Sequence, residues 1–423
     1  MPELKRTLTV WRGTGMFLNI VLGAGLLTLP GLTAQAAGAG ALWVWAACAL
    51  AAAPLLAVFA ILGRRFPNSG GLAGMLRAGF GDTGYIAGTL LFLGAVVFGL
   101  PAIALTGGHY AAAMLGGGSA ATYAVLLLLM ATGVNLISAE KAGRVNAALA
   151  SLLIVVLLGV AAVGWALTTP GTAQLAEAAA APPSIPVFGL VFMMVFFAFT
   201  GWEVGANLSG EFKRPERDFP IALGLSFVTA VALYAILALV VQAAGLTGGW
   251  EAPFATLFAG AFGAVGGIAI SAISVLLIFA NLSAAVWAVS RMVYAAARED
   301  LLPAALTDLR RDMPWRAVLV TVAALVLVVA AAGAGLVDLG TLLGIAGQNF
   351  LLLYAGAAAV LVRLSGAWWH APLGLGCLAL TAALVAARGA DGMIYPLALL
   401  GIAGAIAISR RRRPSGGVLR PGE

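Results

Sequence analysis

Charged residues are scarce in this sequence. Asp, Glu, Lys and Arg make up only 9% of the 423 residues, whereas a soluble domain carries about 25%. Hydrophobic residues account for 62%. So little charge cannot cover a soluble surface, and the composition excludes an ordinary soluble protein. Because long apolar runs cross a bilayer as helices, it predicts an all-α integral membrane protein.

Cysteine and histidine are also rare, with two of each. Cys48 and Cys377 lie inside apolar segments, which argues against a disulfide framework. His109 and His370 fall near predicted helix ends and have no partner at metal-ligand spacing. We therefore expect no metal, no organic cofactor and no enzymatic activity. The alternative from that class is an intramembrane lipid-linked transferase, which would need clustered acids, bases or metal ligands.

Apolar stretches of about 20 residues predict twelve transmembrane helices. Their approximate spans are 14–36, 40–62, 85–113, 120–138, 144–168, 186–208, 219–245, 257–291, 316–335, 337–362, 369–387 and 391–409. With the N-terminus in the cytoplasm, all 23 basic residues except Arg388 fall on the cytoplasmic side. This distribution follows the positive-inside rule and predicts that both termini are cytoplasmic.

The net charge of +7 does not indicate nucleic-acid binding, because the basic residues follow the predicted membrane surface. We expect the run from Arg410 to Arg413 to rest on anionic lipid head groups, with a regulatory or partner-binding role as the alternative. The inner loops are short, so no extramembrane domain is expected, and residues 410–423 form a basic cytoplasmic tail. Membrane lipids are thus expected partners, and the oligomeric state stays open.

The first apolar segment is interrupted by small residues, Gly23-Ala24-Gly25 before Leu26. Glycine lowers helix propensity by about 1 kcal/mol relative to alanine and permits non-helical dihedrals. If the helix unwinds there, the backbone N–H groups of residues 23–26 lie at the positive end of a half-helix dipole, which suits a carboxylate. The alternative is that these small residues only let helices pack closely.

A second interruption lies in the sixth apolar segment, within residues 196–211. The residues concerned are Ala198, Phe199, Thr200, Gly201 and Trp202. Unwinding there would free carbonyl groups at the negative end of a half-helix dipole, which suits an ammonium group. Two such sites facing each other match the head group of an α-amino acid near the membrane midplane. We expect Trp202 to form a pocket wall over the ligand; an interfacial anchor is the alternative.

Glu203 follows directly, deep in the apolar run. A charge at membrane depth costs roughly 2.5 kcal/mol or more, so an intramembrane carboxylate is a functional candidate. Glu203 is a candidate proton carrier. Two alternatives stay open: it forms a structural hydrogen bond to a neighbouring helix, which is an equally good interpretation, or it contacts the ligand. In the eighth segment, Asn281 and Ser283 are candidates to line the pathway, although helix-to-helix hydrogen bonding is the simpler interpretation.

Four motifs in order make the chain resemble the amino acid–polyamine–organocation superfamily of transporters over residues 10–315. They are Gly23-Ala24-Gly25, the Arg-Phe-Pro-Asn-Ser-Gly-Gly sequence at 65–71, residues 199–203 with 211–220, and residues 290–303. The resemblance implies five-plus-five inverted repeats, discontinuous helices one and six at the substrate, and alternating access. It divides the chain into an N-terminal half with the first repeat (1–168), a second repeat (186–362) and two additional helices (369–409).

Within this superfamily the chain is most similar to bacterial exporters of methionine and branched-chain amino acids. That similarity implies a bacterial-type cytoplasmic membrane. Some proton-coupled members carry a lysine in helix five that replaces a sodium ion. The fifth segment here has no lysine beyond its entrance at Arg144, which leaves the coupling ion open.

Together these features predict a secondary active transporter of neutral amino acids with apolar side chains, the methionine, leucine, isoleucine and valine class. We expect proton-coupled efflux, with the amino acid and a proton or other coupling ion as partners. The alternatives are an uptake permease or exchanger of the same superfamily, a major facilitator protein and a passive channel.

Overall fold

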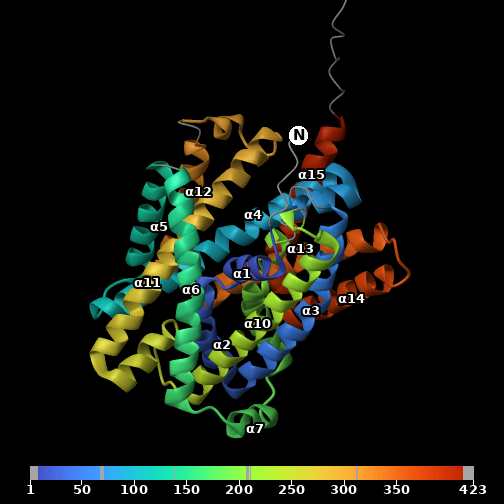
Figure 1. Ribbon diagram of the computed structural model, residues 1–423. Helices are drawn as coiled ribbons and strands as arrows, with labels where there is room; N and C mark the ends of the chain where they lie inside the picture. Colours follow the sequence, from blue (N-terminus) through green and yellow to red (C-terminus); the bar gives the residue numbers. More distant parts are fainter. Residues whose placement is uncertain are drawn as a thin grey trace, which may run out of the picture.

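The computed structural model describes residues 8–412 except 67–70, 138, 206–208, 210 and 311–312. Within these residues the chain is helical and contains no β-strand, which confirms the all-α class (Figure 1). Part of the motif at 65–71 and most of the basic tail lie outside the described residues.

Fifteen α-helices are assigned in the described part of the chain. They are α1 (Val10–Val21), α2 (Leu29–Ala37), α3 (Ala41–Arg65), α4 (Gly71–Leu115), α5 (Ala120–Ile137), α6 (Ala139–Thr168), α7 (Thr172–Ala180), α8 (Ile185–Phe196), α9 (Trp202–Gly205), α10 (Pro215–Ala243), α11 (Pro253–Arg298), α12 (Trp315–Gly333), α13 (Leu339–Arg363), α14 (His370–Arg388) and α15 (Ile394–Arg412). Helices suit these apolar sequences because each backbone N–H and C=O finds its partner within the same segment.

The first apolar segment is interrupted between α1 and α2. α1 ends at Val21, and a short 3-10 helix, η1 (Ala24–Leu27), precedes α2. Gly23 has an extended backbone with φ −81° and ψ 164°, so the α-helical hydrogen bonds cannot continue through it. Pro30 lies in the first turn of α2, where its missing N–H costs nothing.

The sixth apolar segment is interrupted between α8 and α9. α8 continues into a 3-10 turn, η3 (Phe197–Phe199), after which Thr200 is extended with φ −101° and ψ 167°. Gly201 has φ +110°, a conformation that a residue with a Cβ rarely adopts. The helix resumes at Trp202. The break therefore falls at Thr200 and Gly201, two of the five residues that the sequence indicated.

The two longest helices each contain a glycine with non-helical dihedrals. It is Gly81 in α4 (φ 64°, ψ −154°) and Gly263 in α11 (φ 68°, ψ −168°), in both cases ten positions after the first residue of the helix. A Cβ at Gly84 would lie 2.3 Å, and one at Gly266 2.6 Å, from a carbonyl oxygen of the short helix before the break. The span expected to begin at 85 is therefore preceded by a short helix packed closely against it. The start expected at 257 falls inside the corresponding short helix, because the break in α11 comes only at Gly263.

Seven helices in the described part of the chain are long and apolar enough to cross a membrane. α6 with α7 makes an eighth if that pair, bent by 88°, counts as one span. Three further apolar helices, at Ala120–Leu136, Ile185–Phe199 and Ile394–Arg410, are shorter. The structure thus supports a multi-pass membrane protein, while the count of twelve spans stays a prediction.

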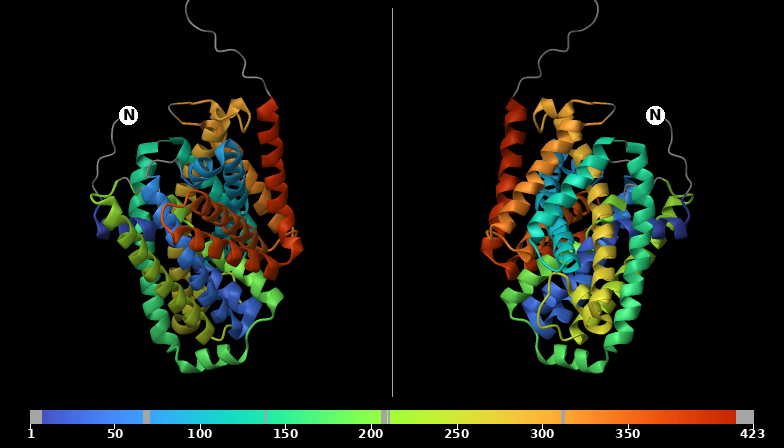
Figure 2. Two further views of the ribbon diagram at one scale, coloured as in Figure 1. Left: turned by 90° about the vertical axis from the view of Figure 1, so that its right-hand side faces the viewer. Right: turned by 90° about the vertical axis from the view of Figure 1, so that its left-hand side faces the viewer.

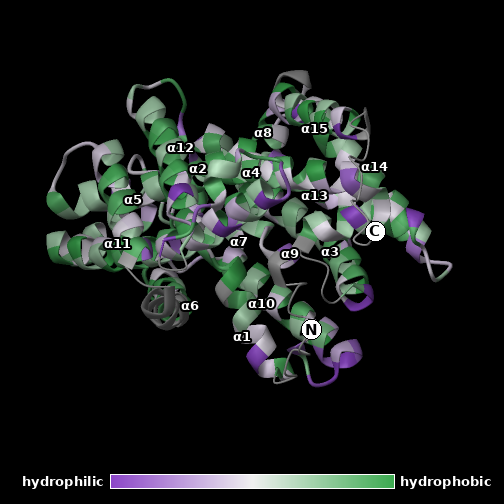
Figure 3. Ribbon diagram, turned by 90° about the horizontal axis from the view of Figure 1, so that it is seen from above, coloured by the Kyte–Doolittle hydropathy of each residue, from purple (hydrophilic) through white to green (hydrophobic). Residues whose placement is uncertain are grey.

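α4 packs along α13, α11 and α5, and α1 packs against α10. Both side views show α7 at the end of the molecule opposite the C-terminal end of α15 (Figures 1 and 2). Seen from above, most of the ribbon is apolar and the hydrophilic residues are confined to short stretches (Figure 3). Such a distribution of apolar residues along the ribbon suits helices surrounded by lipid rather than water.

Candidate functional site

A cavity of about 370 Å³ lies between the two interruptions. The cavity is lined by the segments around both interruptions and by α4, α11 and α13. The lining residues are Ile20, Val21, Gly23, Gly25, Leu26, Phe92, Val96, Gly99, Leu100, Ile103, Phe197, Ala198, Thr200, Gly201, Glu203, Asn281, Ala284, Ala285, Ala288, Val289 and Phe350. Small-molecule sites typically measure about 300–1,000 Å³. The two interruptions, 175 residues apart along the chain if counted from Gly25 to Thr200, therefore share one ligand-sized space.

The first interruption contributes Gly23, Gly25 and Leu26 to the cavity wall. Gly25 leaves space beside it, because a Cβ there would meet nothing closer than 3.8 Å, at the side chains of Leu29 and Phe197. Ala24 begins η1, and only its backbone is described. The wall at this point is thus made largely of main chain.

Two hydrogen bonds hold the end of η1 in place. The hydroxyl of Tyr110 on α4 donates to the Leu27 carbonyl oxygen at 2.8 Å. The Thr28 hydroxyl donates to the carbonyl oxygen of Glu251, just before α11, at 2.7 Å. The end of η1 is therefore fixed to α4 and to the segment that leads into α11, although nothing in the sequence around Tyr110 distinguished it from other buried aromatics.

The second interruption contributes Ala198, Thr200 and Gly201 to the cavity wall. The Thr200 hydroxyl donates to the Phe197 carbonyl oxygen at 2.7 Å, and the Tyr234 hydroxyl on α10 donates to that of Ala198 at 2.8 Å. A carbonyl oxygen has two lone pairs, so the Ala198 carbonyl oxygen can accept a further hydrogen bond, whereas that of Phe197 also accepts from the Thr200 N–H at 3.3 Å. The carbonyl groups freed by the break are thus partly satisfied by the protein itself.

Glu203 lines the cavity and is 3% exposed. Its Oε2 accepts hydrogen bonds from the Gly201 N–H at 2.9 Å and from the hydroxyl of Tyr354 on α13. These donors offset part of the cost of burying a carboxyl group. The contact with Tyr354 corresponds to the structural hydrogen bond that the sequence left open, and the position in the cavity wall leaves the other two roles available.

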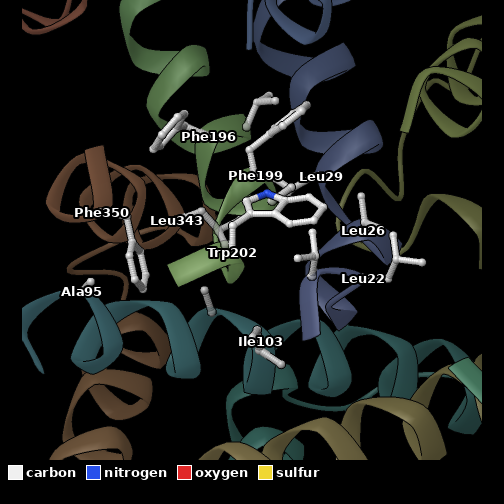
Figure 4. Packing of buried hydrophobic residues seen from close by; sticks show 14 of the residues in the cluster. Leu22, Leu26, Leu29, Ala95, Ile103, Phe196, Phe199, Trp202, Leu343 and Phe350 are labelled. Carbon is white, nitrogen blue, oxygen red and sulfur yellow. The ribbon is translucent and has the colours of Figure 1, made fainter. Parts of the chain in front are cut away.

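Trp202 and Phe199 do not line the cavity. Trp202 is 2% exposed, and its ring packs against Phe227 on α10 with the centroids 5.8 Å apart. Figure 4 shows it within a cluster of buried apolar side chains that includes Leu26 and Phe199. Its indole N–H has no hydrogen-bond partner among the described residues. Trp202, the expected ligand cover, is therefore packed among buried side chains outside the cavity wall in this conformation.

The two candidates on α11 differ in their surroundings. Asn281 lines the cavity. Ser283 instead joins two helices, because the Asn135 side-chain amide on α5 donates to its carbonyl oxygen at 2.9 Å and to its hydroxyl at 3.4 Å. The helix-to-helix interpretation thus describes Ser283, and the pathway interpretation remains for Asn281.

The rest of the cavity wall is apolar. Phe92, Val96 and Ile103 come from α4, Phe197 from η3 and Phe350 from α13. Glu203 is the one charged residue among the described residues that line the cavity. Sequence reasoning missed these apolar residues, because the cavity-facing and lipid-facing sides of a membrane helix are equally hydrophobic.

A family model described as "Amino acid permease" matches residues 8–408. The chain belongs to this family. The match covers nearly the whole chain and agrees with the superfamily resemblance of the four motifs. Amino acid permeases are multi-pass membrane transporters rather than enzymes.

Three curated relatives of this permease are bacterial proteins. It is 31% identical over 408 residues to the uncharacterized amino acid permease YecA of Bacillus subtilis (strain 168), covering 94% of this chain and 95% of the relative. It is 31% identical over 239 residues to the L-methionine/branched-chain amino acid exporter YjeH of Escherichia coli (strain K12), covering 55% and 56%. The serine/threonine exchanger SteT of Bacillus subtilis (strain 168) is 25% identical over 317 residues, covering 71% and 70%.

Proposed function

We propose that this permease is a secondary active transporter of neutral amino acids with apolar side chains and works by alternating access. The observation that carries the proposal is the single cavity bounded by both helix interruptions. Its wall combines irregular main chain with apolar side chains and one carboxyl group. Irregular backbone at membrane depth is tolerated where it lines a cavity or is covered by protein.

The two interruptions would bind the two ends of the amino acid head group. The first N–H groups of a helical turn have no partner within the turn, so within the segment from Gly23 to Leu26 the N–H groups of Ala24 and Gly25 would donate to the carboxylate. Those of Gly23 and Leu26 already donate to the carbonyl oxygens of Val21 at 2.8 Å and of Gly23 at 3.2 Å. The carbonyl groups of Ala198 to Thr200 would accept from the ammonium group with their remaining lone pairs. Supporting this arrangement, both segments lie in one cavity wall.

The side chain of the amino acid would contact the apolar part of the wall. Phe92, Val96 and Ile103 on α4 offer no partner for a charged or strongly polar side chain. We assign the role of ligand cover to Phe197 and Phe350, which line the cavity, in place of Trp202. The name of the relative YjeH, an exporter of methionine and branched-chain amino acids, supports the same substrate class.

We assign proton coupling to Glu203, the one carboxyl group in the cavity wall of the described residues, and pathway lining to Asn281. A proton moving on and off Glu203 would change the charge beside the substrate and its hydrogen bond to Tyr354. Net efflux then follows from the gradients. An uptake permease or exchanger of the same family would use the same site in the other direction.

The topology proposed with this function is twelve spans with both termini in the cytoplasm and two inverted repeats at 1–168 and 186–362. The matching glycine breaks of α4 and α11, each ten positions into its helix, support such a repeat. So do the paired interruptions at η1 and η3. α7 and the C-terminal end of α15 lie at opposite ends of the molecule, which agrees with an extracellular and a cytoplasmic face of the proposed topology (Figure 2).

The purified permease in proteoliposomes tests the proposal. Uptake and efflux of a panel of radiolabelled amino acids would be measured with and without an imposed pH gradient. We expect methionine, leucine, isoleucine and valine to be carried, to exchange across the membrane and to accumulate when the gradient is applied. Flux of charged amino acids at equal rate, or flux that never accumulates substrate, contradicts the substrate class or the coupled mechanism respectively.

A further inference from the structure

A second cavity, of about 460 Å³, lies between the C-terminal end of α3 and the start of α14. Its lining includes Arg64 and Arg65 of α3, Glu216 in the first turn of α10, and residues around the start of α14 such as Gly366 and His370. It shares no lining residue with the cavity between the two interruptions. α14 packs against α3, so the space belongs to a contact between helices (Figure 1). We call it the arginine cavity.

The arginine cavity carries an excess of positive charge. Arg64 and Arg65 are exposed, and neither forms an ion pair with a carboxylate among the described side chains. Arg65 donates one hydrogen bond, from Nη1 to the carbonyl oxygen of Leu364. A guanidinium group has five N–H donors and stays charged, so most of its donors remain available. Glu216 is the one acidic residue among the described residues that line this cavity.

His370 adds no acceptor to the cavity. Its Nδ1 accepts hydrogen bonds from the N–H groups of Gly366 at 3.2 Å and Ala367 at 3.3 Å. An imidazole whose Nδ1 is an acceptor carries its proton on Nε2, which then only donates. The same bonds occupy the main-chain N–H groups just before α14, so the cavity depends on its side chains. Except for the Glu216 carboxylate, its polar side chains offer only donors, which suits an anion.

Two tryptophans indicate that the cavity lies at the level of lipid head groups. Trp368 is 88% and Trp369 43% exposed, and Trp369 lines the cavity. Exposed tryptophans concentrate where a membrane meets water. In the proposed topology α3 ends and α14 begins on the cytoplasmic side. Basic cavities between transmembrane helices at this surface can bind phosphate head groups, and a guanidinium fork can contact two phosphate oxygens at once.

We propose that the arginine cavity binds the phosphate group of an anionic phospholipid. The phosphate oxygens accept hydrogen bonds from Arg64 and Arg65, and the acyl chains extend into the bilayer. A lipid fits better than free phosphate because Trp368 and Trp369 expose indole rings beside the cavity. The bound head group links α3 in the first proposed repeat to α10 in the second and to α14. The leaflet rests on the proposed topology, whereas the binding itself requires neither that topology nor transport.

The test is thermal unfolding of the purified permease in detergent at increasing concentrations of phosphatidylglycerol, phosphatidylcholine or inorganic phosphate. The proteins compared are the wild type, the double variant Arg64→Gln/Arg65→Gln and the control Arg298→Gln/Arg310→Gln. Arg298 and Arg310 are exposed and do not line the arginine cavity. The control therefore removes the same charge from the same proposed side of the membrane.

We expect phosphatidylglycerol to raise the unfolding temperature of the wild type and of the control until the effect saturates, because a ligand that binds only the folded protein stabilises it. The double variant should need about tenfold more of this lipid for the same rise, since it lacks the charge-assisted hydrogen bonds. Phosphatidylcholine should act more weakly than phosphatidylglycerol, because its positive choline group would lie beside the arginines. Inorganic phosphate should leave the unfolding temperature almost unchanged.

Three results would overturn the proposal. They are a double variant that responds to phosphatidylglycerol like the control, phosphatidylcholine that acts as strongly as phosphatidylglycerol, and inorganic phosphate that does so at equal concentration. The last result would assign the cavity to free phosphate. If the double variant does not purify as a monodisperse protein, Arg64→Gln alone decides, because Arg65 then keeps its bond to Leu364. A permease that binds phosphatidylglycerol as expected but transports no amino acid would contradict only the proposed function, so the two failures are distinguishable.

Discussion

At the scale of single residues, glycines leave room for a ligand because they have no side chain. A Cβ at Gly99 on α4 would lie 2.7 Å from the Phe197 ring, so this glycine provides the space that the ring occupies. A Cβ at Gly25 would be 3.8 Å from the same ring. The ring of Phe197 thus lies against the main chain of α4, and Gly25 leaves part of the cavity open beside it.

Substitutions at Gly25 should therefore act by size. Gly25→Ala should keep most of the leucine transport rate, because the added methyl group makes only ordinary contacts. Gly25→Leu should abolish transport, since its side chain would fill the space between Gly25 and Phe197. Transport rates in proteoliposomes, normalised to the amount of reconstituted protein, measure the difference. Full transport by Gly25→Leu would refute the head-group site at the first interruption.

Proton coupling at Glu203 predicts a specific change in pH dependence. Glu203→Gln should flatten the dependence of net transport on pH while exchange of amino acid survives, because glutamine keeps the polar contacts but carries no titrating proton. Asp218→Asn is the matched control. Asp218 is also 3% exposed, but it lies at the start of α10 beside Arg214 and does not line the cavity.

Transport would be followed between mildly acidic and mildly alkaline pH for both variants. A pH profile of Glu203→Gln that matches the profiles of Asp218→Asn and the wild type would leave Glu203 with only its structural bond to Tyr354.

At the scale of elements, each interruption contains a glycine in a non-helical conformation, and the positive φ at the second one requires glycine. Gly201 has φ +110°, and a Cβ there would lie 3.3 Å from the Ile20 side chain. Gly201→Ala should therefore destabilise the protein by about 1–2 kcal/mol through backbone strain. Gly404→Ala, on α15, is the matched control. Its new methyl group meets nothing within 4 Å, and the backbone there is helical.

Thermal unfolding in detergent compares these two variants. We expect Gly201→Ala to unfold at a lower temperature than the wild type and Gly404→Ala at an equal or higher one, because alanine favours a helix over glycine. Equal unfolding temperatures for both variants would mean that Gly201 does not need its positive φ.

The positions of both interruptions could be predicted from the sequence. Gly23-Ala24-Gly25 and Thr200-Gly201 combine weak helix formers inside runs that are otherwise apolar. The structure has non-helical backbone at Gly23, Thr200 and Gly201. Local propensity was informative here because the adjacent residues act together on one short stretch of backbone.

Other features could not be predicted because they depend on tertiary contacts. Gly81 and Gly263 are two of 55 glycines, and the apolar pattern continues across Gly263. The side chain of Trp202 follows the turn at Gly201, so its direction is set by a dihedral angle that the sequence does not reveal. Tyr234 is an aromatic residue in an apolar helix, and only the fold brings it to two separate segments.

At the scale of the whole molecule, the proposed topology fixes which end faces the cytoplasm. α7 and the end of α15 lie at opposite ends of the fold (Figure 1). The proposed orientation places α7 outside the cell and Arg298, at the end of α11, inside. Leu175 on α7 is 56% exposed and Arg298 is also exposed, so both positions suit chemical labelling.

Cysteine labelling in right-side-out vesicles tests this orientation. In a variant with Cys48 and Cys377 replaced by serine, a membrane-impermeant maleimide should label Leu175→Cys and not Arg298→Cys until the vesicles are opened. Cys48 and Cys377 are buried, so even their native thiols should react slowly. Labelling of both sites in sealed vesicles, or of Arg298→Cys alone, would contradict the proposed topology.

The central claim is that one cavity recognises both ends of a zwitterion through two interrupted segments. Binding of leucine, 3-methylbutylamine and 4-methylpentanoate to the purified permease tests it most directly, because the two analogues each lack one charged group. Calorimetry should detect binding of leucine, and each analogue should bind at least about tenfold more weakly because one set of backbone partners stays unpaired. An analogue that binds as tightly as leucine would contradict the claim.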